Sequence, residues 1–189
     1  MRKMKLTYCK LGNQKIAQSV IRFDLPTHVC GQRCFRCYAR KSEVLFPNTL
    51  KFRNRNLDLA NSDQFVETID NEIKFSGVSI CRPHCSGDFF SQKYVDDWTE
   101  VMKRNPKVRF YFWSKKLDKF DFSKMAKRRN CNAMDSITPL GLNYGNQEFI
   151  VKLRDEHGYT ICPDMGEHMV CMRSCKLCLK EKKVAFLIH

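Results

Sequence analysis

Two kinds of spacing between apolar residues alternate along the chain, and they predict strands and helices in turn. Short apolar runs, each bounded by turn-forming residues, predict strands at 19–23, 78–82 and 108–113. A further strand or turn is predicted at 159–161. The stretches between the first three strands are long enough for helices, so strand and helix alternate. This order is typical of βαβ units around a parallel sheet.

Two of the connecting stretches show clear helical spacing. The first helix is predicted to begin after Asn61 or Ser62, either of which suits an N-cap, and to end before Gly77. The second follows a polar turn and is closed by Pro106. Their apolar stripes are Phe65, Val66, Ile69 and Ile73 in the first, and Val95, Trp98, Val101 and Met102 in the second. A third, basic helix is predicted to reach about Arg129.

The length of the chain limits the size of this sheet. A complete (β/α)8 barrel needs about 250 residues, so 189 residues predict a partial, truncated (β/α) barrel. With no repeat, low-complexity tract or linker in the sequence, we expect one domain, with the partial barrel over 1–157 and a cysteine-rich extension over 158–189. In such α/β folds the chemistry gathers in the loops after the carboxyl ends of the strands.

Composition narrows the class of protein and raises the question of the cysteines. No apolar run approaches the roughly 18 residues of a membrane span, and the first ten residues lack the apolar core of a signal peptide. We therefore expect a cytoplasmic protein with no membrane partner. The chain has 11 cysteines, and in a reducing compartment clustered cysteines indicate metal ligands or redox centres before disulfides.

The charge is strongly positive and uneven. Lys and Arg number 34 against 20 Asp and Glu, and the segment from Lys103 to Arg129 holds 11 basic and two acidic residues. Such a surface suits a polyanion, with DNA or RNA the first expectation. The aromatic run 110–113 beside it is suited to stacking on unpaired bases, although alternate members of a strand must point into the core. The alternative is a solvated lysine-rich face that aids solubility.

Three cysteines in one short loop after the first predicted strand form a C-x3-C-x2-C triplet: Cys30, Cys34 and Cys37. Three thiolates leave a four-coordinate centre one ligand short, and an open position is where a substrate or cofactor binds. A 4Fe-4S cluster held by three cysteines exposes one iron in this way. The alternatives are a zinc site completed by His28 or Cys9, or three free thiols.

The carboxy-terminal region offers a complete set of four thiolates, with His168 able to replace the first of them: Cys162, Cys171, Cys175 and Cys178. Four cysteines hold either a tetrahedral zinc ion or a second 4Fe-4S cluster. Either centre would tie down a segment that has little apolar core of its own.

The triplet resembles the signature of the radical SAM enzymes, in which the open iron is chelated by S-adenosylmethionine (SAM). The resemblance implies SAM-binding positions at Tyr38, Ser86, Gly87 and Asp88, with Asp88 placed to accept from the ammonium group of SAM. One position differs, because Arg36 stands where these enzymes usually have an aromatic residue. Asp88 also suits a cap for the following helix, and the two roles are compatible.

Three stretches resemble a narrower family, the gene product 88 proteins of phages and bacteria. They are Cys37 to Arg40, Arg82 to Ser91 with Tyr94 and Trp98 following, and the cysteine-rich end, so that the likeness runs from about Cys30 to Cys178. This resemblance implies that the protein acts in a bacterium, and that its gene belongs to the bacterium or to a phage.

Together these features lead us to expect a radical SAM-like enzyme that cleaves SAM with the help of an electron donor and modifies a large substrate, nucleic acid included. Its substrate rim would be Arg82, His84, Trp113 and Lys115. His84 has three open interpretations: a fourth ligand, a proton donor, or a histidine satisfied by backbone, which we favour. The alternative function is a metal-stabilised nucleic-acid-binding protein without catalysis, and ferredoxin-like electron transfer ranks third.

Overall fold

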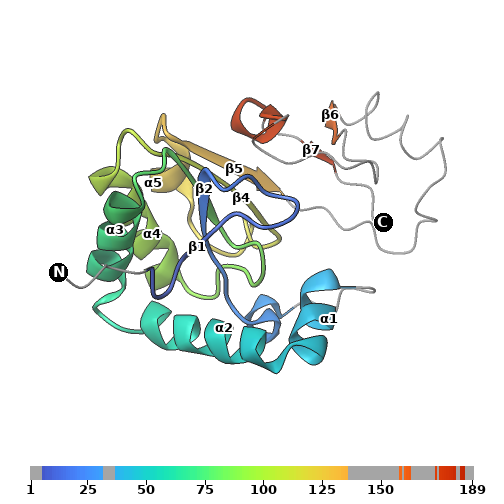
Figure 1. The fold of residues 1–189 in the computed structure, drawn as a ribbon. Helices are drawn as coiled ribbons and strands as arrows, with labels where there is room; N and C mark the ends of the chain where they lie inside the picture. Colours follow the sequence, from blue (N-terminus) through green and yellow to red (C-terminus); the bar gives the residue numbers. More distant parts are fainter. Residues whose placement is uncertain are drawn as a thin grey trace.

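The computed structural model describes residues 6–31, 37–135, 158, 160–162, 173, 175–181, 184 and 185. Its centre is a sheet in the order β1-β2-β3-β4-β5, in which every neighbouring pair but the first is parallel (Figure 1). The strands are β1 (Lys10–Leu11), β2 (Val20–Phe23), β3 (Ile80–Pro83), β4 (Arg109–Ser114) and β5 (Cys131–Asp135). The described sheet is open, so the fold is mixed α/β with parallel strands in chain order.

Helices connect the parallel strands. They are η1 (Thr27–Cys30), α1 (Tyr38–Leu45), α2 (Pro47–Ala60) and α3 (Phe65–Ser76) between β2 and β3, α4 (Gln92–Arg104) between β3 and β4, and α5 (Ser123–Ala126) between β4 and β5. Figure 1 shows α3 and α4 side by side, with α1 and α2 at one end of the sheet. A second small sheet pairs β6 (Thr160–Ile161) with β7 (Val184–Ala185), and η2 is Leu177–Leu179.

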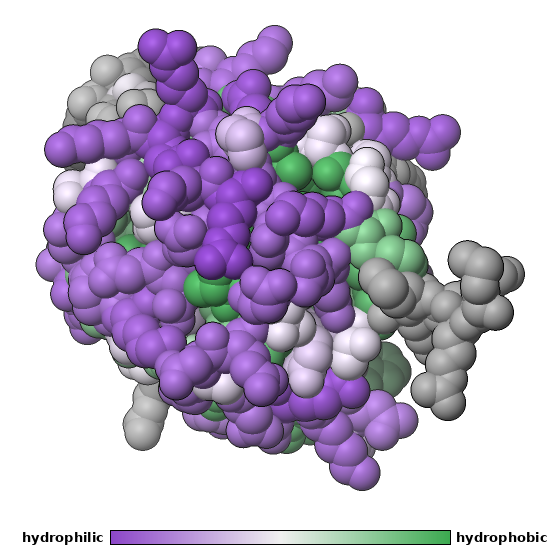
Figure 2. Space-filling model, turned by 90° about the vertical axis from the view of Figure 1, so that its left-hand side faces the viewer, coloured by the Kyte–Doolittle hydropathy of each residue, from purple (hydrophilic) through white to green (hydrophobic). Residues whose placement is uncertain are grey.

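The main core lies between the sheet and the helices, as the amphipathic spacing requires. It contains a group of aromatic rings in edge-to-face contact, among them Phe23, Phe65 and Trp98, with ring centroids 5.4–6.0 Å apart. Outside it, the surface over α3 is mostly hydrophilic (Figure 2). No helix among the described residues has the length and apolar character that a membrane crossing demands.

The two faces of β4 serve different cores because strand residues alternate in direction. Phe110 and Phe112 join the helix-side core, whereas Tyr111 packs on the opposite face with Cys178 and Val184. The carboxy-terminal segment is fixed there by hydrogen bonds from β4 and β5: Arg109 Nη2 to Leu179 O and Asn132 Nδ2 to Cys178 O, both 2.8 Å.

This burial corrects the prediction that the run 110–113 stacks on bases. Phe110, Tyr111 and Phe112 are all buried, and Trp113 is half-buried in contact with the second core. The inward direction of alternate rings is as predicted, but stacking by Tyr111 is wrong, because the second face of β4 is covered as well.

The three strongest strand predictions are confirmed to within two residues by β2, β3 and β4, and the short strand at 160–161 also forms. Both periodic helices are confirmed. Gly77 ends α3 in the left-handed conformation, with a φ of 65°. The N-cap of α3 is Gln64, so neither predicted cap residue holds that position. The predicted boundary of the carboxy-terminal extension follows residues 136–157, which lie outside the described residues.

The predicted basic helix is wrong, because helix forms there only at α5, four residues long. Local side-chain bonds hold the preceding residues in turns: Ser114 Oγ accepts from Lys116 N at 3.1 Å and Asp121 Oδ1 from Ser123 N at 2.8 Å. Among the elements that the periodicity did not predict are α1, α2 and β5. Pro47 at the first position of α2 was an available signal for its start.

Gly87 allows the turn after β3 to pack against the end of β2, and this contact gives a prediction. It has a φ of 83°, and an added Cβ would overlap Leu25 Cβ. We expect Gly87→Ala to lower the free energy of unfolding by roughly 2–4 kcal/mol, through backbone strain and overpacking together. Urea denaturation measures this loss.

Gly77 provides the matched control, since it also has a positive φ but nothing lies within 4 Å of its added Cβ. Gly77→Ala should lower the free energy of unfolding by about 1 kcal/mol, which is the effect of backbone strain alone. Equal losses in the two variants would contradict the close packing of Gly87 on Leu25.

Candidate metal and cofactor site

The loops that carry the predicted site all leave the sheet at one edge. The cysteine loop follows β2, the turn 84–88 follows β3, and 115–116 follow β4. Because these strands are parallel and in register, their carboxyl ends meet at the same edge. The prediction that the cysteine loop and the turn 84–88 follow the carboxyl ends of strands is therefore correct.

The cysteine loop is described at its two ends. Cys30 is the last residue of η1, and Cys37 immediately precedes α1; both are half-buried. Cys34 lies outside the described residues, as do Phe35 and Arg36. Gly31 turns the chain after η1 with a φ of 64°.

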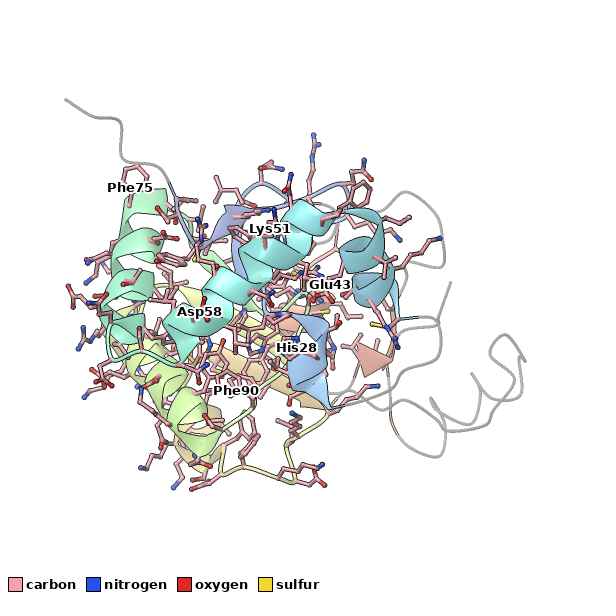
Figure 3. The ribbon with its side chains drawn as sticks, turned by 90° about the horizontal axis from the view of Figure 1, so that it is seen from below. His28, Glu43, Lys51, Asp58, Phe75 and Phe90 are labelled. Atoms are coloured by element: carbon pink, nitrogen blue, oxygen red, sulfur yellow. The ribbon has the colours of Figure 1, made fainter. Side chains whose placement is uncertain are left out.

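A buried ion pair fixes the start of this loop. The Glu43 carboxylate accepts from Thr27 N at 2.9 Å and from the Thr27 hydroxyl, and Arg53 Nη1 donates to it at 2.8 Å. Figure 3 shows η1 and α1 lying beside each other over α2, with His28 and Glu43 labelled. Burial of the pair suits a rigid anchor, because the carboxylate has hydrogen-bond donors from two elements.

Lys116 holds the same loop from the other side. Its side chain is buried, and Nζ donates to Val29 O at 2.9 Å. A single ammonium therefore connects the end of β4 to the turn that ends at Cys30. The sequence instead led us to place the neighbouring Lys115 at the substrate rim, since no local pattern distinguishes these two lysines.

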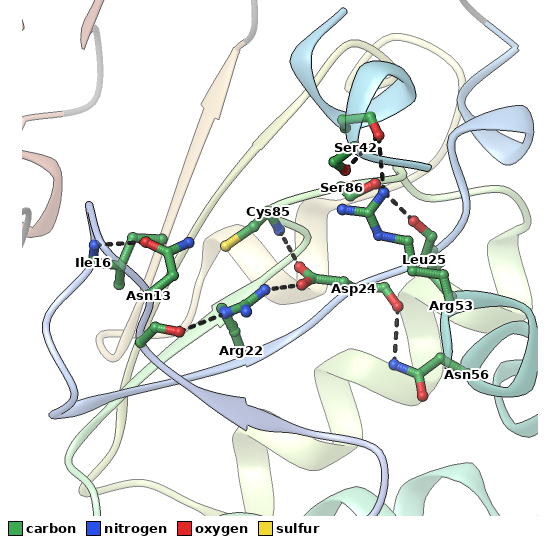
Figure 4. Close-up of polar contacts among 12 residues, drawn as sticks. Asn13, Ile16, Arg22, Asp24, Leu25, Ser42, Arg53, Asn56, Cys85 and Ser86 are labelled. Carbon is green, nitrogen blue, oxygen red and sulfur yellow. Dashed lines mark hydrogen bonds and ion pairs between the residues drawn. The ribbon is translucent and has the colours of Figure 1, made fainter. Parts of the chain in front are cut away.

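Asp24 joins the end of β2 to the turn after β3 (Figure 4). Its Oδ1 accepts from Cys85 N at 2.9 Å, and its Oδ2 accepts from Arg22 Nη1. Asn56 Nδ2 from α2 donates to the backbone carbonyl of Asp24 at 2.9 Å. Asp24 is 4% exposed, so these bonds replace the water that a carboxylate would otherwise hold.

The turn after β3 also bonds directly to β2. Ser86 Oγ donates to Leu25 O at 2.9 Å, and Leu25 N donates to Ser86 O at 2.9 Å. The Tyr38 hydroxyl donates to the carbonyl of Cys85, so that α1 contacts the same turn. Although Tyr38 as a residue is 68% exposed, its hydroxyl is turned inward, and burial of that group raises its pKa to about 12.

Asp88 is buried and bonded within the protein. Its Oδ1 accepts from Ser114 Oγ at 2.7 Å and Phe89 N at 2.8 Å, and its Oδ2 accepts from Lys115 N at 3.0 Å. Burial raises the pKa of Asp88, and these hydrogen bonds act in the opposite direction. The alternative role as a helix cap is wrong, because Ser91 caps α4 by accepting from Tyr94 N at 3.2 Å.

His84 has an unusual backbone and a buried ring. Its φ is 62°, a region that non-glycine residues seldom adopt. The ring Nε2 lies 2.9 Å from the Tyr94 hydroxyl, and Nδ1 has no hydrogen-bond partner in the described structure. Its backbone N–H donates to Phe23 O at 2.9 Å. Of the two ring nitrogens only Nε2 is bonded, and its partner is a tyrosine, whereas the interpretation that we favoured assigned the ring to backbone.

Of the remaining rim residues, Arg82 and Trp113 lie on the face that the carboxy-terminal segment covers. The Arg82 guanidinium carbon lies 4.6 Å from the Trp113 ring centroid and 5.8 Å from that of Tyr111, so Arg82 makes cation–π contacts with both rings. Lys115 contributes its backbone N–H to Asp88.

The carboxy-terminal cysteines are partly described. Cys178 is buried in the second core, where Cys85 also lies, and the half-buried Cys162 packs against that core. Cys175 is half-buried, while Cys171 and His168 lie outside the described residues. Within the described part of the chain, no three His, Cys, Asp or Glu side chains gather as a metal-binding group. Cys9, the alternative zinc ligand, is buried in the helix-side core.

Several basic residues of the segment 103–129 lie at the other edge of the sheet. The connections from α4 to β4 and from α5 to β5 both lie where strands begin, and Asn130 Nδ2 joins them by donating to the carbonyls of Met102, Asn105 and Val108 at 3.0–3.2 Å. The exposed cations of these connections are Lys107, Arg109, Lys127 and Arg129. We call these four residues the amino-edge cluster.

These features define an α/β protein with a cysteine-bearing loop at the carboxyl edge of an open parallel sheet. The family model described as gene product 88 matches residues 3–133, which cover all five strands of this sheet except the last two residues of β5. The chain belongs to the gene product 88 family. No curated protein and no solved structure matches it.

The buried His84 ring gives a prediction about pH. Burial, with smaller effects of Lys116 and Arg82, lowers its pKa from 6.5 to about 3. Between these values the unfolded chain binds a proton that the folded chain does not, so His84 makes the protein less stable as the pH falls from 6.5 towards 3. Well below pH 6.5 the loss approaches about 1.4 kcal/mol per pH unit.

The His84→Asn variant isolates this effect, because asparagine tolerates a positive φ and does not titrate. Urea unfolding between pH 7 and pH 4.5 should show a shallower fall in stability for the variant than for the wild type. The raised pKa of Asp88 has the opposite sign but contributes to both proteins. Parallel curves would show that His84 does not remain neutral in the folded state.

Proposed function

We propose that this protein is a radical SAM-like iron–sulfur protein of the bacterial cytoplasm, with a partial (β/α) barrel that modifies a large substrate. The observation that carries the proposal is the position of the Cys30 to Cys37 loop, which leaves β2 at the carboxyl edge where the loops after β3 and β4 also lie. Catalytic loops of parallel α/β proteins occupy this edge.

The described residues fit an iron–sulfur cluster in their chemistry. Cys30 and Cys37 are half-buried, a burial that shields thiolates from bulk water while leaving them reachable. The segment that leads into Cys30 is held by Glu43 through Thr27 and by Lys116 through Val29. With Cys34, three thiolates would hold the cluster and leave one iron open. When bound, such a cluster supplies the electron for reductive cleavage of SAM.

The residues of this chain would bind and orient SAM beside that position. Gly87 lets the turn pack closely on Leu25, and Ser86 fixes the same turn by its bonds to Leu25, so both would hold the SAM-binding turn in place. The Asp88 carboxylate already accepts hydrogen bonds from Ser114, Phe89 and Lys115. An ammonium group would therefore donate to the second lone pair of Oδ2. Tyr38 would hold α1 to the turn through its hydroxyl.

A second centre, zinc or 4Fe-4S, would be held by Cys162, Cys171, Cys175 and Cys178. The support for it is the burial of Cys178 against a sheet face that the cysteine-rich segment covers. A metal there would fix this segment in place, a structural role.

The first prediction tests iron and its ligands. Protein purified without oxygen should be brown, contain iron and acid-labile sulfide, and cleave SAM to 5′-deoxyadenosine when reduced by dithionite. Cys34→Ala should remove about four iron atoms per chain and all SAM cleavage while sparing metal at the carboxy-terminal site. Metal analysis and chromatography of the nucleoside product measure these outcomes.

Cys131→Ala is the matched control, because Cys131 lies in β5 and outside both cysteine groups. It should retain full iron and SAM cleavage. Colourless protein with zinc alone would overturn the enzyme proposal. Loss of both centres in Cys34→Ala would show that the two cysteine groups form one site.

The alternative function, nucleic-acid binding without catalysis, is favoured by the amino-edge cluster. Lys107, Lys127 and Arg129 are exposed and make no ion pair with a described carboxylate. By contrast, the exposed Arg104 pairs with Glu100. Unpaired cations at one edge suit the phosphates of DNA or RNA.

The triple variant Lys107→Ala/Lys127→Ala/Arg129→Ala tests this surface. If it contacts phosphates, single-stranded DNA should bind more weakly, and the slope of log K against log salt concentration should fall in magnitude by up to about 2. Fluorescence anisotropy at several salt concentrations measures both. A control with Lys93, which is paired with Asp97 on α4, replaced by alanine should bind like the wild type. An unchanged slope in the triple variant would favour the solvated-face interpretation.

A further inference from the structure

Helix α1, which begins directly after Cys37, exposes large apolar side chains. Tyr38 is 68% exposed, Val44 75%, Leu45 58% and Phe46, which follows the helix, 60%. Three of these residues are consecutive and lie at the corner between α1 and α2, at the periphery of the molecule (Figure 1). Contiguous apolar surface of this kind marks an interaction site more often than isolated exposed residues do.

The contacts that hold α1 in the fold do not require these side chains. The buried residues of α1 are Ala39 and Glu43, and Glu43 contacts Arg53 and Thr27. Tyr38 adds a bond through its hydroxyl alone, which leaves its ring exposed. The apolar side chains at 44–46 are therefore available to another molecule.

Positive charge accompanies the apolar residues. Arg40 and Lys41 are exposed on α1, and neither forms an ion pair with a carboxylate in the described structure. On α4, by comparison, Lys93 and Lys103 each pair with a carboxylate three or four residues away. The surface of α1 thus combines an apolar centre with unpaired cations, the complement of an apolar patch that carries acidic residues.

This surface also begins at a cluster ligand of the proposed function. Cys37 is the N-cap of α1, and an eight-residue helix is about 12 Å long. A protein bound along α1 would therefore lie beside the cysteine loop. The amino-edge cluster, in contrast, lies across the length of the sheet.

We propose that α1 and Phe46 form the docking surface for a small acidic one-electron carrier protein, which reduces the centre at Cys30, Cys34 and Cys37. The inference rests on the proposed function, because it names the partner of the same site. In each encounter the carrier is oxidised by one electron and the centre is reduced by one, with no bond formed or broken. A second copy of this chain fits less well, since its own Arg40 and Lys41 would meet like charges.

The experiment compares two reductants. A flavodoxin in its reduced form serves as the acidic carrier, and dithionite serves as a small reductant that needs no docking surface. We expect Leu45→Ser/Phe46→Ser and Arg40→Glu/Lys41→Glu each to slow reduction by flavodoxin about tenfold or more, while dithionite reduces both variants at the wild-type rate. Stopped-flow absorbance of the centre follows both reactions.

Controls elsewhere on the surface are available. Phe75→Ser replaces an exposed apolar residue on α3, and Lys103→Glu reverses an exposed charge on α4. Both should be reduced by flavodoxin at the wild-type rate. Circular dichroism verifies that all four variants are folded.

A binding measurement separates this inference from the proposed function. Calorimetric titration of metal-free protein with flavodoxin should show a salt-sensitive affinity that both α1 variants lose about tenfold. Protein without iron would overturn the proposed function, and through it the electron-transfer role. Iron-loaded protein whose α1 variants bind and accept electrons normally would overturn the docking surface alone. Sedimentation that shows a dimer abolished by Leu45→Ser/Phe46→Ser would also overturn it.

Discussion

The buried carboxylate of Asp24 joins three segments that are far apart in sequence. It receives the Cys85 N–H from the turn after β3 and the Arg22 side chain from β2, while its own carbonyl receives Asn56 from α2. A carboxylate with 4% exposure is stable only when such donors replace water. The position of the β3 turn relative to the cysteine loop therefore depends on this group.

The sheet separates two surfaces of different chemistry. Its parallel strands place the cysteine loop, the β3 turn and Lys116 at the carboxyl edge, and the α-to-β connections with their exposed cations at the amino edge. The six residues of β4 separate the two edges by about 20 Å. A nucleic acid held at the amino edge would thus be anchored away from the cysteine loop, so the two candidate functions use different surfaces.

The elements that the sequence predicts correctly are those marked by local features of the chain. Gly77 and Pro106 mark helix ends by their backbone chemistry, and the period of Val95, Trp98 and Met102 identifies α4. The sequence also predicts which edge of the sheet carries the cysteine loop, because loops that follow parallel strands all leave the sheet at the same edge. Partnerships across long sequence separations were not accessible: Glu43 meets Thr27 from 16 residues away, and Lys116 meets Val29 from 87. The prediction of a basic helix was wrong because the charge of a segment does not reveal the turns that Ser114 and Asp121 form.

The region matched by the family model ends at residue 133, before the segment that shields Tyr111 and Cys85. That segment contributes Leu177, Cys178 and Val184 to the second core and is bonded to Arg109 and Asn132. The cation–π pair of Arg82 and Trp113 lies on this same covered face. In this chain, access to that pair is therefore controlled by residues that lie outside the matched region.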